Sequence, residues 1–240
     1  MPFSKLRSVF SKSPSPSFQT METFEDPPLT PITLSGYRQN TKHHLLNEEL
    51  AEELRQHIPS LLQIGHNWKL DYSLEQNGTS LNTLYNCVAP KVGENKTRRK
   101  GYLLIVQDKN KNIFGAYIND YLRPLDGKYY YGNGDCFLWK VEKSKVKKLS
   151  RSIENDNAST SSNTKLNALR LKVFPYTAIN DFIIYSNNDF ISIGSGDGKF
   201  GLWVDSNLDT GASDSVDTFG NEPLSDNVKF NIIALEIWRI

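Results

Sequence analysis

The residues with the clearest potential for chemistry form a glycine-rich run near the C-terminus. Gly196, Gly198 and Gly201 match the G-x-G-x-x-G spacing of a dinucleotide-binding loop. Such a loop has to open a helix, because the helix N-terminus supplies the N–H groups that hold the pyrophosphate. Residues 200–204 are instead aromatic and β-branched, as in a strand, and no Ser or Thr follows Lys199 as a Walker A motif requires. We therefore predict a glycine-rich turn between two strands and no nucleotide cofactor.

Cys136 and Asp135 are the second candidate for chemistry. They follow Gly134 at the start of an apolar strand. A reactive thiol needs exposure and a lowered pKa, whereas a neighbouring carboxylate raises the pKa. We predict that Cys136 packs in the core, and that Asp135, like Asp197 and Asp205, hydrogen-bonds its own turn. An antioxidant activity of Cys136 or Asp135 stays open as the alternative.

Metal-binding and triad patterns are weak in this chain. The four histidines form no His-x-x-x-His pair, and Cys87 and Cys136 form no Cys-x-x-Cys pair, so we expect no zinc site. A Ser-His-Asp triad would require His57 or His66 to reach the strands that follow. The Asp-x-Asn-x-Asn pattern at 108–112 resembles a calcium loop, but it lacks the glycine and the closing glutamate. We expect neither a metal nor a cofactor.

The bulk composition excludes several classes of protein. The chain has 240 residues, enough for one good core. Its 28 basic and 27 acidic residues balance, which does not favour binding to nucleic acid. No apolar run approaches the length of a membrane span, so we expect no integral membrane contact. Two cysteines cannot make a disulfide framework, and we expect a reducing compartment.

Two segments differ in composition from the rest of the chain. Residues 1–42 are rich in serine, proline and threonine, which predicts a disordered basic tail ahead of a domain at 43–240. The first part of this tail lacks acidic residues, so a mitochondrial targeting segment stays the alternative, although Pro14 and Pro16 would break its helix. Residues 142–165 are lysine-rich and then almost wholly polar, which predicts a mobile insertion.

Helices are predicted only in the first part of the domain. Asn47 is a suitable N-cap for a helix whose apolar residues recur every four positions up to Ile58, and Pro59 ends it. Ser80 caps a second short helix that contains Leu84.

From residue 100 onward the pattern is that of short strands joined by tight turns. We predict strands at 102–106, 114–118, 129–131, 137–139, 169–173, 182–186, 190–194, 200–204 and 230–238. Residues 129–131 and 137–139 form a hairpin-like pair in this reading. The last strand is apolar on both faces, with Ile233, Leu235 and Ile237 on one and Ile232, Ala234 and Trp238 on the other, so it should lie inside a sheet.

This pattern predicts an α+β protein that is mainly β. We expect a sandwich of two antiparallel β-sheets flanked by short helices.

Four stretches in the same chain resemble the TLDc domain family of the oxidation-resistance proteins. They are Trp68–Ser73 continued by Gly78–Tyr85; Leu103–Asp108 with Phe114–Tyr117; Tyr131–Trp139; and Ser192–Trp203 continued by Thr218–Asn221 and Leu235–Trp238. They come in the family's order and span about residues 45–240, so the chain resembles a minimal, single-domain member. The family often has Glu where Asp135 stands, which weakens any catalytic role of this carboxylate. The polar insertion also departs from the family pattern.

The resemblance implies a non-enzymatic protein that protects against oxidative stress. It implies binding to the V1 sector of the vacuolar-type proton-pumping ATPase, and we expect this binding to promote disassembly. We expect a cytoplasmic chain, monomeric on its own and recruited to the vacuolar or endolysosomal membrane through the pump. The residues expected to contact the partner are Asp197, Gly198, Lys199 and Trp238. Those expected to shape the fold are Gly132, Gly134, Asp135, Gly194, Gly196, Gly201, Trp203 and Gly220.

Overall fold

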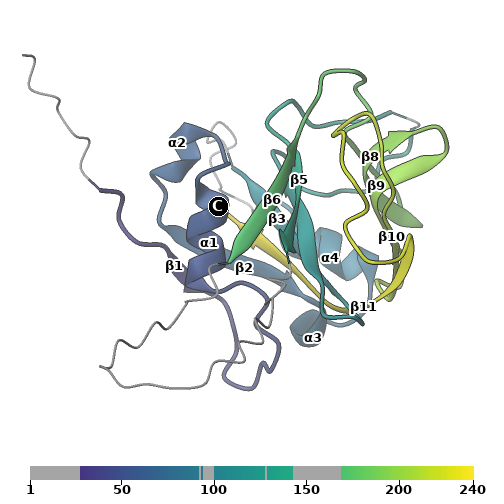
Figure 1. Cartoon of the computed structure of the whole chain (residues 1–240). Helices are drawn as coiled ribbons and strands as arrows, with labels where there is room; N and C mark the ends of the chain where they lie inside the picture. Colours follow the sequence, from purple (N-terminus) through teal and green to yellow (C-terminus); the bar gives the residue numbers. More distant parts are fainter. Residues whose placement is uncertain (1–27, 92, 94–99, 128, 143–168) are drawn as a thin grey trace, which may run out of the picture.

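The computed structural model describes residues 28–91, 93, 100–127, 129–142 and 169–240 (Figure 1). The helices in these ranges are α1 (Glu48–Arg55), α2 (Ser60–Gln63), α3 (Leu74–Asn77) and α4 (Leu81–Val88). The strands are β1 (Thr33–Ser35), β2 (Asn67–Ser73), β3 (Tyr102–Asp108), β4 (Ile113–Ile118), β5 (Phe137–Glu142), β6 (Arg170–Pro175), β7 (Ile184–Ser186), β8 (Phe190–Gly196), β9 (Lys199–Asp205), β10 (Thr210–Ala212) and β11 (Lys229–Arg239). None of these helices is long and apolar enough to cross a membrane.

Both predicted helix caps are confirmed. The Asn47 side chain accepts a hydrogen bond from the Leu50 backbone N–H at 2.8 Å, and it satisfies one of the free donors at the start of α1. Ser80 does the same for α4, where its hydroxyl accepts from the Thr83 N–H at 3.4 Å. Both helices then turn an apolar face towards the strands.

The strands form one continuous hydrogen-bonded network in the order β6-β5-β4-β3-β11-β10-β9-β8-β7. The long strand β11 joins its parts, since it pairs with β3 on one edge and with β2 and β10 on the other. Strand β1 adds to β2 in parallel, and the remaining described pairs are antiparallel. The predicted mainly β, antiparallel architecture with few helices is confirmed, and the interior position of the last strand with it. The division into two sheets stays a prediction.

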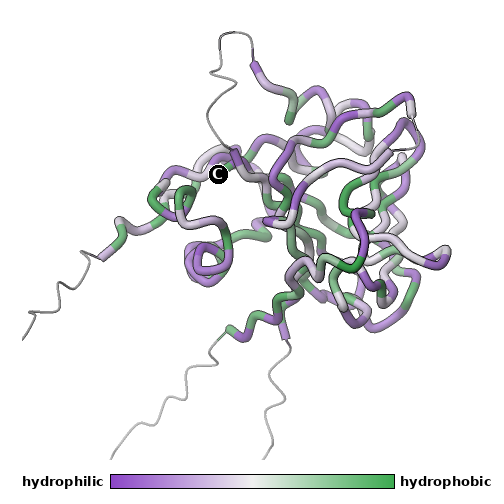
Figure 2. Tube along the Cα trace, turned by 90° about the horizontal axis from the view of Figure 1, so that it is seen from above, coloured by the Kyte–Doolittle hydropathy of each residue, from purple (hydrophilic) through white to green (hydrophobic). Residues whose placement is uncertain are grey.

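The central strands are buried on both faces. Leu103 and Ile105 of β3 pack with the residues of α1, whereas Leu104 and Val106 pack with α4, β8 and β9. Figure 1 shows the same arrangement, with α1 on one side of β3, β5 and β6 and with β8–β10 on the other. In Figure 2 hydrophobic stretches of the trace run through the middle of the molecule, and many of the hydrophilic stretches lie at its periphery. Burial on both faces explains why residues 102–106 are apolar without alternation.

The predicted faces of the last strand are correct only in its C-terminal half. Leu235 and Ile237 pack in one core cluster, and Ala234 and Trp238 in the other. Ile233 was placed with the first group, but its side chain is 47% exposed. The pairing of β11 with β3 shifts register between Ile232 and Ala234, and such a bulge reverses the alternation before it.

The predicted pairing of residues 129–131 with 137–139 is wrong. Both edges of β5 are occupied, by β4 and by β6, so no edge is left for the earlier segment. Tyr131 instead forms an antiparallel bridge with Ile184, and its hydroxyl lies 2.7 Å from the Ser186 hydroxyl.

Part of the segment predicted as a tail belongs to the fold. β1 pairs with the start of β2, Ile32 is buried, and the Ile32 N–H donates to the Glu52 carboxylate at 2.7 Å. These contacts are non-local, and the serine- and proline-rich composition concealed them. Residues 1–27 and, apart from Glu142, the predicted insertion at 142–165 lie outside the described residues.

Candidate functional site

The glycine-rich run forms the tight hairpin between β8 and β9. The two residues at its tip, Asp197 and Gly198, have φ of 50° and 73°, as a type I′ turn requires. Gly196 and Lys199 pair across the end of the hairpin, and a strand follows where a nucleotide loop would open a helix. The prediction of a turn between two strands is confirmed.

The tip of this hairpin is free to meet a partner. Asp197 and Gly198 are exposed, and a β-carbon added to Gly198 would meet no atom within 4 Å. The Lys199 side chain is 53% exposed, and its ammonium lies 3.4 Å from the Asp214 carboxylate. Such a partly exposed ion pair is weak, so the Lys199 charge is available to a partner.

Trp238 is not a contact residue. Its side chain is fully buried, and its indole N–H donates to the Glu236 carboxylate at 2.8 Å. The sequence prediction placed it at a partner surface because it lies near the chain end, but the residues around it belong to the core on the α1 side.

Two glycines of the predicted motif are required by their surroundings. Gly194 has φ of +75°, and a β-carbon there would lie 2.7 Å from the Phe219 ring. A β-carbon on Gly201 would lie 2.8 Å from the Ile193 carbonyl oxygen of the neighbouring strand. Trp203, another predicted motif residue, lies half-buried on β9. The remaining ones lie in turns or near strand ends: Gly132, Gly134, Asp135, Gly196 and Gly220.

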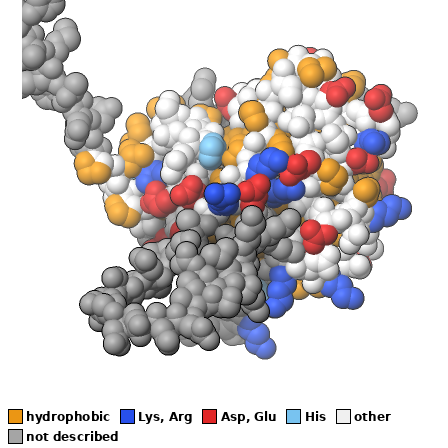
Figure 3. Space-filling model, viewed as in Figure 1, with side chains coloured by type: hydrophobic (Ala, Val, Ile, Leu, Met, Phe, Trp, Pro, Cys, Tyr) orange, Lys and Arg blue, Asp and Glu red, His pale blue; other side chains and the backbone are white. Residues whose placement is uncertain are grey.

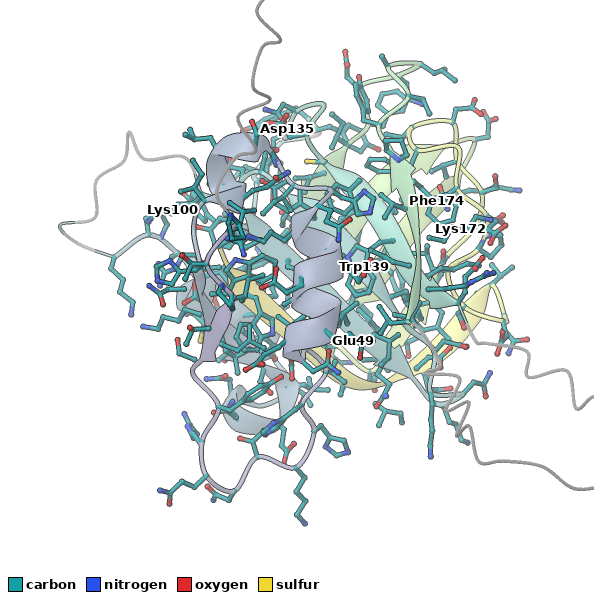
Figure 4. The ribbon with its side chains drawn as sticks, turned by 60° about the vertical axis from the view of Figure 1, so that its left-hand side comes forward. Glu49, Lys100, Asp135, Trp139, Lys172 and Phe174 are labelled. Atoms are coloured by element: carbon teal, nitrogen blue, oxygen red, sulfur yellow. The ribbon has the colours of Figure 1, made fainter. Side chains whose placement is uncertain are left out.

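A groove lies beside the turn that precedes β5. It encloses about 430 Å³ and is lined by His57, Ile58 and Pro59 on one side and by Gly134, Asp135, Cys136, Phe137, Val173 and Pro175 on the other. Figure 4 shows Asp135 at one end of this region, with Trp139 behind α1 and Phe174 and Lys172 along β6. No local sequence signal links His57 to the Asp135–Cys136 turn, so their meeting in this groove could not be predicted.

Asp135 is held by its own turn, as predicted. Its backbone N–H donates to the Asn133 side-chain oxygen at 2.9 Å, and the Asn133 amide donates to the Asp135 carboxylate at 3.1 Å. Among the described residues, no hydrogen bond joins His57 to Asp135 or Cys136. The groove therefore lacks the linked nucleophile, base and orienting acid of a triad.

Cys136 has the environment of a packed thiol. It is 1% exposed, and its Sγ–H donates to the Asn119 side-chain oxygen at 3.1 Å. Burial raises the pKa of this thiol to about 11, so the nucleophilic thiolate is scarce near neutral pH.

We expect native Cys136 to resist alkylation. In a Cys87→Ser variant, iodoacetamide near neutral pH should leave Cys136 almost unlabelled, while the same variant in denaturant labels fully. Labelling should rise as the pH approaches 11, because the thiolate forms there. Mass spectrometry of the intact protein measures both states, and rapid labelling of the folded variant at neutral pH would contradict the buried, protonated thiol.

The turn at 108–112 satisfies its aspartate without a metal. The Asp108 carboxylate accepts from the Asn112 backbone N–H, from the Asn112 side chain and from the Ser225 hydroxyl, at 2.6–2.8 Å. Within the described ranges no three His, Cys, Asp or Glu side chains lie together as a metal site would require.

The sequence is similar to one protein family and to several named proteins. The family model described as TLDc domain matches residues 39–240. The chain is 43% identical over 249 residues to oxidation resistance protein 1 of Debaryomyces hansenii, covering 89% of this chain and 76% of that protein. It is 41% identical over 226 residues to the protein of the same name in Yarrowia lipolytica, covering 94% and 86%. With the Saccharomyces cerevisiae protein of that name it shares 41% identity over 220 residues, covering 90% and 80%.

Proposed function

The chain belongs to the TLDc domain family, and we propose from this that it acts in resistance to oxidative stress. The observation that carries the proposal is the family match over residues 39–240, since it includes nearly all of the described fold. The relatives compared above are themselves named for oxidation resistance.

We propose further that the protein acts by binding and not by catalysis. The burial and raised pKa of Cys136 oppose thiol chemistry, and Asp135 is engaged within its own turn. A protective factor that acts in mitochondria through Cys136 or Asp135 remains the competing hypothesis. A Cys136→Ser variant that still protects cells from peroxide would rule out its thiol form.

The finer proposal is that the partner is the V1 sector of the vacuolar-type proton-pumping ATPase. The family resemblance supports it, and the exposed β8–β9 hairpin supplies a contact. We propose that the strands form a rigid sandwich of two sheets, and that it binds a strained or detached V1 better than the assembled pump. Binding shifts an assembly equilibrium only by this difference in affinity.

The test mixes the purified chain with membranes that contain the pump. ATPase activity is assayed, and the membranes are sedimented to locate V1. Release of V1 with loss of coupled activity supports a disassembly factor. If V1 stays on the membrane and no chain co-sediments, the partner is a different one.

Reversing the charge at the hairpin is expected to weaken V1 binding about tenfold, as the loss of one partner-contact charge pair would. The variant is Lys199→Glu, and Lys69→Glu on β2 is the matched control, since Lys69 is also exposed but lies away from the hairpin. Both variants should keep the wild-type melting temperature. Equal V1 affinity of Lys199→Glu and the wild type would show that the hairpin lies outside the interface.

A further inference from the structure

The outer face of β7–β9 is aromatic. Tyr185, Ser192 and Trp203 lie opposite one another in one row across the three strands, and Phe190 lies opposite Asp205 in the next row of β8 and β9. The alternate residues of these strands point into the core: Ile184, Ile191, Ile193, Leu202 and Val204. Since side chains alternate along a strand, the first set faces away from the core.

Six rings form a continuous contact chain on and beside this face, which we call the aromatic face. The ring centroids of Tyr130 lie 4.9 Å from Phe182 and 5.6 Å from Tyr185. Tyr185 lies 5.4 Å from Phe190, which is 6.0 Å from Phe200 and 6.0 Å from Trp203. Phe182 is 45% exposed, and none of the other five rings is fully buried. A cluster of partly exposed aromatic rings is typical of an interaction site.

The middle of the face contains a polar group that the fold leaves unused. Ser192 is 1% exposed between its cross-strand neighbours Tyr185 and Trp203. Its hydroxyl has no hydrogen-bond partner among the described residues.

Five of the six rings lie in a chain segment that is rich in acidic residues, one of which, Glu222, pairs with Lys140 and Lys172 from outside the segment. Residues 176–228 contain nine acidic residues and one basic residue, a net charge of −8, although the whole chain carries +1. The one basic residue, Lys199, lies at the end of the β8–β9 hairpin and forms a weak, partly exposed ion pair with Asp214. Figure 3 shows acidic and hydrophobic side chains, with some basic ones among them, over the part of the surface where β8–β10 lie in Figure 1.

Three carboxylates lie next to ring residues in the chain or in the strand register, and one of them, Asp181, also accepts a hydrogen bond from the Tyr176 hydroxyl. Asp181 and Asp189 precede Phe182 and Phe190 in the chain, and Asp205 lies across from Phe190. Burial raises the pKa of Asp205, and the neighbouring Asp209 carboxylate adds to this effect. A cation placed beside this pair would relieve the repulsion between the two carboxylates.

We propose that the aromatic face binds a segment of a protein partner that is rich in arginine and lysine. Guanidinium groups stack on aromatic rings and pair with carboxylates, and this surface offers both within one patch. Nucleic acid and anionic membranes are negatively charged, so the acidic side chains beside the aromatic face would repel them. The aromatic face of a second copy of the chain would be repelled for the same reason. The proposal deepens the proposed function, on which it rests for the partner's identity: the segment would be a basic stretch of V1.

The test measures binding of fluorescein-labelled deca-arginine to the full chain by fluorescence anisotropy. We expect binding that weakens with salt and that is tighter than for deca-lysine, because only arginine stacks as a planar group. Phe182→Ala with Phe190→Ala should weaken it about tenfold, the effect of losing two stacking contacts. Ile64→Ala is the control, since Ile64 is an exposed apolar residue on α2 (66% exposed) that lies outside the face.

A second double variant keeps the proposal testable if the ring variant fails to fold. Asp181→Asn with Asp189→Asn keeps all the rings and should weaken binding about fivefold at low salt, through two lost charge pairs. Equal affinity for deca-arginine and deca-lysine would overturn the stacking, and unchanged binding in both double variants would overturn the site. Concentration-dependent dimerisation that the ring variants abolish would identify a second copy as the occupant, and would overturn the proposed partner.

Binding of V1 to the same variants separates the two proposals. If wild-type chain binds V1 and the ring variants bind equally well, the proposed function stands and the aromatic face is wrong. If wild-type chain fails to bind V1, the proposed function fails, while the deca-arginine measurement still decides the chemistry of the face.

Discussion

Replacing Trp238 by alanine is expected to lower the free energy of unfolding by about 3–5 kcal/mol. The indole is fully buried in the core on the α1 side, and its N–H donates to the buried Glu236 carboxylate at 2.8 Å. The Tyr37 ring meets it edge-on at 5.2 Å, and the Tyr37 hydroxyl donates to the same carboxylate. The substitution therefore leaves a large cavity and removes one donor from a buried acid.

The matched control is Trp203→Ala, the same chemical change on the half-exposed outer face of β9. Folding removes less apolar surface from water at Trp203 than at Trp238. We therefore expect Trp203→Ala to lower the free energy of unfolding by roughly 1–2 kcal/mol. Urea denaturation of both variants measures the difference. Trp238→Phe should be more stable than Trp238→Ala and less stable than the wild type, because phenylalanine fills much of the cavity but makes no hydrogen bond to Glu236. Equal losses for Trp238→Ala and Trp203→Ala would contradict the assignment of Trp238 to the core.

Local signals made most of the strands and helices predictable. Asn47 and Ser80 predict helix starts because the side chain of each accepts a hydrogen bond from a backbone N–H that has no partner within the helix. The Asp197-Gly198 pair predicts a hairpin turn because aspartate and glycine both adopt positive φ at low energetic cost. These three features depend on two or three neighbouring residues, and they were predicted correctly.

Contacts between distant parts of the chain could not be predicted in the same way. Strand β1 exists because it pairs with residues more than thirty positions away, and Tyr131 bridges Ile184 because β5 has no free edge. The bulge at Ile232 and the meeting of His57 with Asp135 also depend on tertiary packing. The aromatic face was missed for a related reason, since its rings come from several strands and only the register aligns them.

Gly115 is expected to be the glycine that tolerates substitution least. It lies on β4 opposite Ile105 and Trp139, in the buried centre of the strand network. A β-carbon there would overlap the Leu104 carbonyl oxygen and approach the Trp139 ring to 3.1 Å. Relief requires β3 and β4 to separate, because the obstacle is backbone and not a flexible side chain. We expect Gly115→Ala to lower the free energy of unfolding by about 3–5 kcal/mol.

Gly196→Ala tests whether this cost comes from the steric overlap or from the loss of a strand glycine as such. Gly196 also lies in a strand, but a β-carbon there would meet no atom within 4 Å, and its φ is not positive. Alanine restricts the unfolded chain, so the free energy of unfolding should change by no more than about 1 kcal/mol. Thermal and urea unfolding of the two variants give the comparison. A Gly115→Ala protein as stable as the Gly196→Ala protein would show that β3 and β4 are not packed as closely as the structure has them.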